Sequence, residues 1–244
     1  MAGVTGTLPQ RFAAVATALA TAIVIVAIAI LPFLTPAWVS FEPGRSDAAR
    51  LTGFTTEQLR TATDAILADL VFGPPDFDVE VAGAPVLNER EQSHMRDVRG
   101  VFGGFGLVAV TAAIAVTAAF LGARRLGHPE RAWRAIRGGA IGLAVGVGVA
   151  GVAALVAFDA LFEIFHRLFF AGGSYTFDPG TEKLVQLFPF TFWSETTMAV
   201  GVVILVLCAV AAAVAGRRAR VAIVVTDAPT GEAARPNPTA EAAR

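Results

Sequence analysis

The chain has 244 residues, of which 55% are hydrophobic, and this apolar share lies above the roughly one-half that is usual for a soluble domain. Its formal net charge is −1, from 19 basic and 20 acidic residues, which excludes a nucleic-acid partner bound through a basic surface. The mean hydropathy of +0.63 predicts an integral membrane protein.

Four apolar stretches are long enough to cross a hydrocarbon core about 30 Å thick, which takes about 20 helical residues. The first is longer than the roughly 7–15-residue apolar core of a secretory signal. No small-x-small cleavage site clearly follows it, so we expect it to be retained. The four stretches comprise residues 12–34, 101–121, 140–161 and 198–216.

Arginine residues indicate the orientation of these spans. Five arginines accompany Glu130 alone in “GARRLGHPERAWRAIRGG” between the second and third spans, and “RRAR” follows the fourth. Cytoplasmic loops carry such an excess, so both segments and both termini are predicted to be cytoplasmic. The expected organisation is an N-terminal segment with the first transmembrane helix (1–34), an extracytoplasmic cap region (35–100), the second helix (101–121), a cytoplasmic loop (122–139), the third helix (140–162), an extracytoplasmic loop (163–197), the fourth helix (198–216) and a cytoplasmic tail (217–244).

The cap region contains two local patterns of regular structure. In “FTTEQLRTATDAILADL”, Thr55 followed by Gln58 forms a capping box, and apolar residues recur at helical spacing, which predicts an amphipathic helix. “DFDVEV” (76–81) alternates apolar and acidic residues as a half-buried strand does, and “SYTF” (174–177) is its expected partner. We therefore expect a membrane all-α fold, a four-transmembrane-helix bundle with a small extracytoplasmic α/β cap.

Asn88, with Glu91 three residues later, predicts a helix that starts in the cap region and runs unbroken into the second span. This helix carries His94 about two turns above the apolar core. Glu91 and Asp97, three residues before and after His94, could accept a ring N–H and select the tautomer. An ordinary surface helix with charge pairs is the alternative for this segment taken alone.

The third span continues into “FEIFHRLFF” (162–170), and Asp159, Glu163, His166 and Phe170 are spaced by four, three and four residues. This spacing places them on one helical face. For a lone histidine, an interfacial ring beside a solvated Glu163 is the simpler interpretation. Asp159 favours protein or water over lipid on this face, because a carboxylate inside the apolar boundary is costly. Two histidines on separate helices are thus expected at one outer interface.

Other features indicate packing or connection rather than chemistry. Cys208 lies in the middle of the fourth span, and His128 lies in a cytoplasmic loop. Metal binding, or a haem held between the two outer histidines, has less support because no known ligand spacing accompanies them. The tail after residue 220 is expected to be disordered. A row of small residues that predicts the close approach of another helix comprises Gly138, Gly142 and Gly146.

Two segments together resemble the bacterial integral membrane family of lipoprotein intramolecular transacylases, namely “EREQSHMRDV” (89–98) and “FDALFEIFHRLFFAGGSYTFDPGTEKLVQLFP” (158–189). The resemblance implies an enzyme of the bacterial cytoplasmic membrane. It would move the sn-2 acyl chain of a diacylglyceryl-modified lipoprotein to the N-terminal cysteine amine and give a lyso-form lipoprotein. His94 and His166 would be its catalytic pair. Lipoproteins and membrane phospholipid are the implied partners, and no cofactor or metal is expected.

The residues suit this chemistry. Aminolysis of an ester needs a base that takes a proton from the amine and an acid that protonates the departing glycerol oxygen, and two histidines can fill both roles. The alternative is a non-enzymatic membrane protein that binds a lipid or protein partner through its cap. The residues expected to support the histidines are Asp97, Asp159, Glu163 and Glu91, and those expected to bind substrate are Phe162, Phe169, Phe170, Tyr175, Arg96 and Arg99, with the amides of Gly172 and Gly173 as further oxyanion donors.

Overall fold

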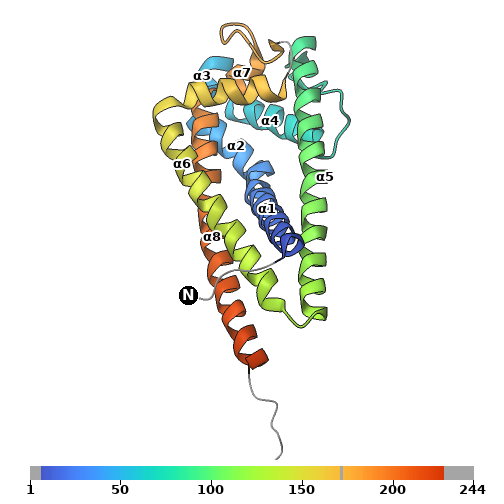
Figure 1. The fold of residues 1–244 in the computed structure, drawn as a ribbon. Coiled ribbons are helices and arrows are strands. Elements are labelled where there is room, and N and C mark those ends of the chain that lie inside the picture. Colours follow the sequence, from blue (N-terminus) through green and yellow to red (C-terminus); the bar gives the residue numbers. More distant parts are fainter. Residues whose placement is uncertain (1–6, 171–172, 228–244) are drawn as a thin grey trace, which may run out of the picture.

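Four long helices make up most of the computed structural model, which describes residues 7–170 and 173–227 (Figure 1). All four are long and apolar enough to cross a membrane, as the sequence predicts. Each apolar stretch of the sequence lies inside one of them. They are α1 (Leu8–Ile30), which the 3-10 helix η1 (Leu31–Leu34) continues, α5 (Glu89–Arg125), α6 (Pro129–Phe169) and α8 (Phe190–Asp227).

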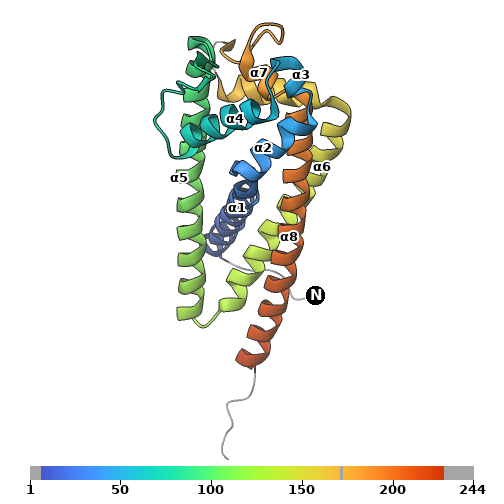
Figure 2. The same cartoon turned by 180° about the vertical axis from the view of Figure 1, so that it is seen from behind.

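Shorter elements gather at one end of the long helices and form the cap (Figure 1, Figure 2). The predicted amphipathic helix is confirmed there as α4, and its capping box is formed by Thr55 and Gln58. Leu59 and Ile66 on the apolar face of α4 join Phe77 and Leu187 in one buried core. The cap comprises α2 (Pro36–Arg45), α3 (Ala48–Thr52), α4 (Thr56–Val71), β1 (Glu80–Val81), β2 (Ala84–Pro85) and α7 (Lys183–Leu187).

The predicted strand at 76–81 is shorter than expected, and its expected partner is wrong. Only its last two residues form a strand, β1, which pairs with β2 in an antiparallel hairpin. Ala82 and Gly83 both have positive φ, 54° and 76°, as the two-residue turn of such a hairpin requires. This local turn closes the pair at a smaller entropic cost than pairing with residues 174–177 would. The register pairs Glu80 with Pro85 and Val81 with Ala84.

Helix α5 confirms the predicted continuous helix from the cap into the second span. Asn88 accepts hydrogen bonds from two amides of the first turn, and Glu91 accepts one from the Asn88 amide in return. Helix α6 is different, because Ala157 has φ −147° and ψ 42° and interrupts it. Beyond this break the end of α6 runs across the top of the molecule toward α5 (Figure 1).

Helices α1 and α6 come into close contact at a glycine that the sequence pattern did not single out. A Cβ on Gly139 of α6 would meet the backbone of Ala18 of α1. The predicted small-residue row of Gly138, Gly142 and Gly146 is wrong, because a Cβ at each would meet open space. Gly142 and Gly146 lie on nearly the same helix face as Gly139, so the close approach of α1 is confined to one turn of α6.

Helix α8 extends further than the sequence suggests. The expected disorder after residue 220 is wrong for 221–227, which are helical, whereas 228–244 lie outside the described residues. The apolar run “VAIVV” simply continues the helix of the fourth span. Within α8, Cys208 is 1% exposed and packs with Ile204 and with Ala140 of α6, as expected of a packing residue.

Gly139→Ala should destabilise the protein by about 1–3 kcal/mol, because the added methyl group must displace the backbone of α1. Gly142→Ala is the matched control on the same helix, since its methyl group enters open space and improves helix propensity. Thermal unfolding in detergent measures the difference. Equal midpoints for the two variants would contradict the close approach of α1 and α6.

Candidate active site

Two histidines from different helices lie face to face beneath the cap. His94 stands on the second turn of α5, and His166 stands near the end of α6, beyond the break at Ala157. The ring centroids are 6.3 Å apart and the ring planes differ by 21°. The structure therefore brings together the two histidines that the sequence analysis selected.

His94 is buried among aromatic rings. Its side chain is 6% exposed, and its ring centroid lies 4.8 Å from that of Phe170 and 5.3 Å from that of Phe177. Among the described residues its Nδ1 atom has no hydrogen-bond partner. Removal from water disfavours the charged form of an imidazole, so this environment favours a neutral ring.

His166 is oriented by its own helix. Its Nδ1 atom lies 2.8 Å from the carbonyl oxygen of Phe162, which can only accept a hydrogen bond, so Nδ1 carries the proton. In the neutral ring the Nε2 atom is then left with a lone pair. The rings of Phe162 and Tyr175 lie 4.1 Å and 5.1 Å from the imidazole. His166 thus presents the lone pair of Nε2 next to aromatic rings.

The predicted supporting acids do not contact the imidazoles. Within the described residues no carboxylate hydrogen-bonds either ring. Glu163 accepts hydrogen bonds from Arg167 Nε, at 2.7 Å, and from the Tyr175 hydroxyl, at 3.1 Å. Glu91, 1% exposed, accepts from the amides of Asn88 and Leu184. Asp97 and Asp159 are exposed.

The predicted substrate-binding arginines donate to main-chain carbonyls of the cap. Arg99 Nη1 donates to the carbonyl oxygens of Asp69 and Gly73, and Arg96 Nη1 donates to that of Asp76. The carbonyls at the end of a helix need such donors, and α4 ends there. The structure thus does not bring these guanidinium groups to the histidines.

The predicted phenylalanines divide into two groups. Phe162 and Phe170 touch the imidazoles, and Phe170, 4% exposed, packs against both of them. Phe169 is 47% exposed on the outside of α6. Of the two glycines considered as oxyanion donors, Gly172 lies outside the described residues, and Gly173 is exposed with φ +73°.

Residues 173–182, here called the aromatic loop, place Tyr175 on His166 and Phe177 on His94. Arg90 and Glu182 hold this loop in place, and the sequence analysis missed both. Arg90 Nη2 lies 2.6 Å and 2.8 Å from the carboxylate oxygens of Glu182, and it also donates to the Thr176 carbonyl. The Arg90 guanidinium also lies over the ring of Phe177, 5.0 Å from its centroid.

Glu182 accepts hydrogen bonds from several of the groups that hold the aromatic loop. It is 8% exposed and also accepts hydrogen bonds from the Asp178 amide and from Asn88 Nδ2. Burial alone would raise the pKa of the Glu182 carboxyl, but the hydrogen bonds from Arg90, Asp178 and Asn88 outweigh it and hold the pKa below its ordinary value. Arg90 lies one turn before His94, so a helical-face argument could have found it, whereas nothing local points to Glu182.

Comparison with known proteins gives two kinds of match. The model of a family described as lipoprotein intramolecular transacylase Lit matches residues 13–193. The solved structure of the membrane integral lipoprotein intramolecular transacylase Lit from Bacillus cereus is 17% identical, with a TM-score of 0.71, over 87% of this chain and 98% of that chain.

Two variants of the Bacillus cereus protein, with one histidine replaced by arginine or by alanine, match with a TM-score of 0.70 and 16% identity. They cover 88% and 87% of this chain and 92% and 96% of their own. No curated protein sequence matches. The matched structures show a shared fold, and the family match includes both histidines and the aromatic loop.

Glu182→Gln should lower the free energy of unfolding by about 1–3 kcal/mol at neutral pH, because an amide cannot replace the charge-assisted bonds to Arg90. Glu80→Gln, at an exposed carboxylate of the cap, is the control and should have little effect. Thermal unfolding and protease cleavage within the aromatic loop measure the loss. Unchanged cleavage would contradict the role of Glu182 in holding the loop.

The effect of Glu182 should also depend on pH. Its pKa is lowered in the folded protein, so its contribution is fully present above the ordinary value of 4.5 and is lost as the pH falls through the folded pKa. The stability difference between the wild type and Glu182→Gln should therefore shrink in acid. A difference that grows in acid would contradict this assignment.

Proposed function

The chain belongs to the family of lipoprotein intramolecular transacylases, and from this premise we propose that it moves the sn-2 acyl chain of a diacylglyceryl-modified lipoprotein to the amine of its N-terminal cysteine. The product is a lyso-form lipoprotein. The observation that carries the proposal is the stacking of His94 on His166, with ring centroids 6.3 Å apart. One bound ester and amine can be reached from both rings at that separation.

His166 is the general base in this proposal. Its Nδ1 proton is held by the Phe162 carbonyl, so Nε2 is the atom that can take a proton from the attacking amine. His94, a neutral ring at the start, takes the other proton of the substrate ammonium and passes it to the departing glycerol oxygen. Its unpartnered Nδ1 supports a ring that exchanges protons with substrate rather than one held by a carboxylate.

The bonds and protons of this acyl transfer balance with the substrate and the two imidazoles alone. The amine nitrogen attacks the ester carbonyl carbon, the C–N bond of the amide forms, and the C–O bond to glycerol breaks. The substrate enters as an ammonium and leaves as a neutral amide, so it gives up two protons. One proton reaches the glycerol oxygen and the other is released to water, and both imidazoles return to their neutral forms.

The surrounding residues orient the reactants and the rings. Amine and ester belong to one molecule, so an enclosure that folds its two ends together can lower the barrier by several kcal/mol. Phe162, Phe170 and Tyr175 form this enclosure around the imidazoles. Glu163 acts through its hydrogen bond to Tyr175, and Glu91 acts by fixing the start of α7.

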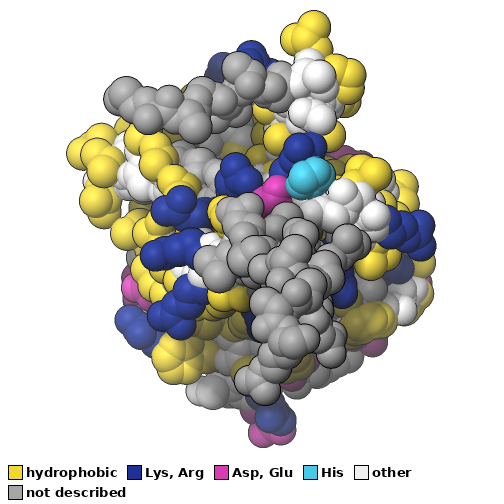
Figure 3. Space-filling view, turned by 60° about the horizontal axis from the view of Figure 1, so that its bottom comes forward, with side chains coloured by type: hydrophobic (Ala, Val, Ile, Leu, Met, Phe, Trp, Pro, Cys, Tyr) yellow, Lys and Arg dark blue, Asp and Glu magenta, His cyan; other side chains and the backbone are white. Residues whose placement is uncertain are grey.

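The proposal also includes two exposed acids and the orientation of the chain in the membrane. Asp97 and Asp159 are exposed, and of the two Asp97 acts on His94 through its charge. The cap faces the extracytoplasmic side, and both termini are cytoplasmic. Figure 3 supports this orientation, since it shows basic side chains, here arginines, at the end opposite the cap, where Arg131 and Arg134 pair with Glu130.

The test of the activity is mass spectrometry of lipoprotein N-termini from a bacterial host with and without this chain. We expect an amide-linked acyl group and a monoacylglyceryl group only when the chain is present. Persistence of the diacyl form at full expression would contradict the proposal.

His94→Asn and His166→Asn should each lower the rate of acyl transfer by at least about 100-fold, because each removes a proton-transfer group. His128→Asn is the matched control, since His128 lies at the opposite end of the molecule beside Glu130. All three variants should express and unfold like the wild type. Full activity in either of the first two would contradict two-histidine catalysis and favour a protein that only binds a lipid or protein partner.

A further inference from the structure

An apolar groove lies between α1 and α5 directly below the cap. Its volume is about 240 Å³, and every residue that lines it is apolar. The groove runs along two consecutive helical turns of α5 and along the end of α1 with η1. Lining residues include Ala27, Leu31 and Leu34 on one side and Phe102, Gly106 and Ala109 on the other.

The groove and His94 lie on the same helix, with the groove further along α5 toward the middle of the span. Phe102 and Ala109 follow His94 by 8 and 15 residues, which places them about 12 Å and 22 Å further along the helix. At the upper end, Leu34 packs against the cap core that contains Met95, the residue next to His94. The groove therefore begins below the histidines and leads away from them.

The depth of the groove matches one leaflet of a membrane. The apolar stretch of α5 begins near residue 101, and the lining residues of α5 occupy its first nine positions. Those positions span about 12 Å of helix, whereas half of the hydrocarbon core is about 15 Å thick. A lipid with its glycerol at the histidines must send its acyl chains through this layer.

We propose that the groove seats one acyl chain of the lipoprotein substrate, an inference that rests on the proposed function. A volume of about 240 Å³ is below the roughly 300–1,000 Å³ of pockets that enclose whole ligands, so the groove suits a single chain. Lipid tails are as apolar as its walls, so little transfer free energy is gained. The groove acts by orientation, because a seated chain holds the ester at the histidines.

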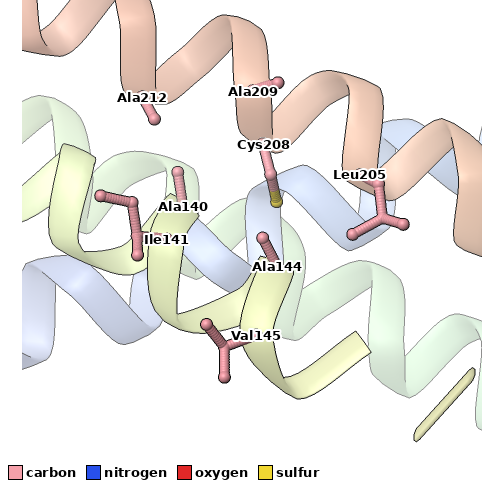
Figure 4. Close-up of a pocket in the computed structure, with 8 residues that line it drawn as sticks. All are labelled: Ala140, Ile141, Ala144, Val145, Leu205, Cys208, Ala209 and Ala212. Carbon is pink, nitrogen blue, oxygen red and sulfur yellow. The ribbon is translucent and has the colours of Figure 1, made fainter. Parts of the chain in front are cut away.

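The cavity between α6 and α8 in Figure 4 is a useful contrast. It has a volume of about 320 Å³, and Ala140, Ala144 and Cys208 are among its lining residues. Ala140 precedes the break at Ala157 by 17 residues, which is about 26 Å of helix, and His166 lies beyond that break. That cavity lies toward the arginine-rich end and does not lie on a route from the active site.

The test compares two leucine substitutions on α5. Gly106→Leu places a side chain in the groove, and a Cβ there meets open space, so the helix itself accepts the change. Gly104→Leu is the matched control. It also meets open space, does not line the groove, and points about 200° away from Gly106. Both variants are assayed as purified full chains with dipalmitoylglyceryl and dihexanoylglyceryl lipopeptides.

We expect Gly106→Leu to lower kcat/KM for the palmitoyl substrate by about tenfold or more, while the hexanoyl substrate, whose chains are too short to fill the groove, is converted at the wild-type rate. Gly104→Leu should convert both substrates like the wild type. If both variants and the wild type convert the palmitoyl and hexanoyl substrates in the same ratio, the inference is wrong and the groove holds bulk phospholipid instead. A wild-type chain that converts neither substrate would overturn the proposed function, and the inference with it.

Discussion

The active site depends on one departure from helical geometry, at Ala157 in α6. A straight helix with the 41 residues of α6 would be about 60 Å long, twice the thickness of a hydrocarbon core. The non-helical backbone at Ala157 turns the final part of α6 across the molecule toward α5. The approach of His166 to His94 exists because of that turn.

Aromatic rings and a backbone carbonyl, rather than carboxylates, surround the two imidazoles. A carboxylate at the edge of a hydrocarbon layer is costly to desolvate, whereas an aromatic ring is not. The acids lie outside these aromatic rings, where they bind the segments that surround the site. Glu91 binds the start of α7, Glu163 binds Tyr175, and Glu182 binds Arg90. In the proposed function this division keeps the rings neutral and able to exchange protons with a substrate.

The shared fold at low identity has a physical explanation. At 17% identity to the Bacillus cereus protein the TM-score is still 0.71, because many combinations of apolar side chains can fill the same contacts between helices. In the proposed function the activity depends instead on a few side chains at the junction of the cap and the membrane spans, where the polar part of a lipidated substrate meets its acyl chains.

The sequence by itself determined whatever rests on local periodicity and composition. The four membrane helices and the capping boxes at Thr55 and Asn88 follow from neighbours within a few residues, whereas His94 and His166 were selected as a pair with the help of the family resemblance. Tertiary structure alone decided the rest. The break at Ala157 has no proline or glycine to announce it, and Glu182 meets Arg90 from 92 positions away. Helix α1 approaches α6 at Gly139 and not one turn later at Gly142, because the point of closest contact is set by the packing of the whole helices. Such pairings depend on three-dimensional contacts between distant segments, which no short-range pattern in the chain encodes.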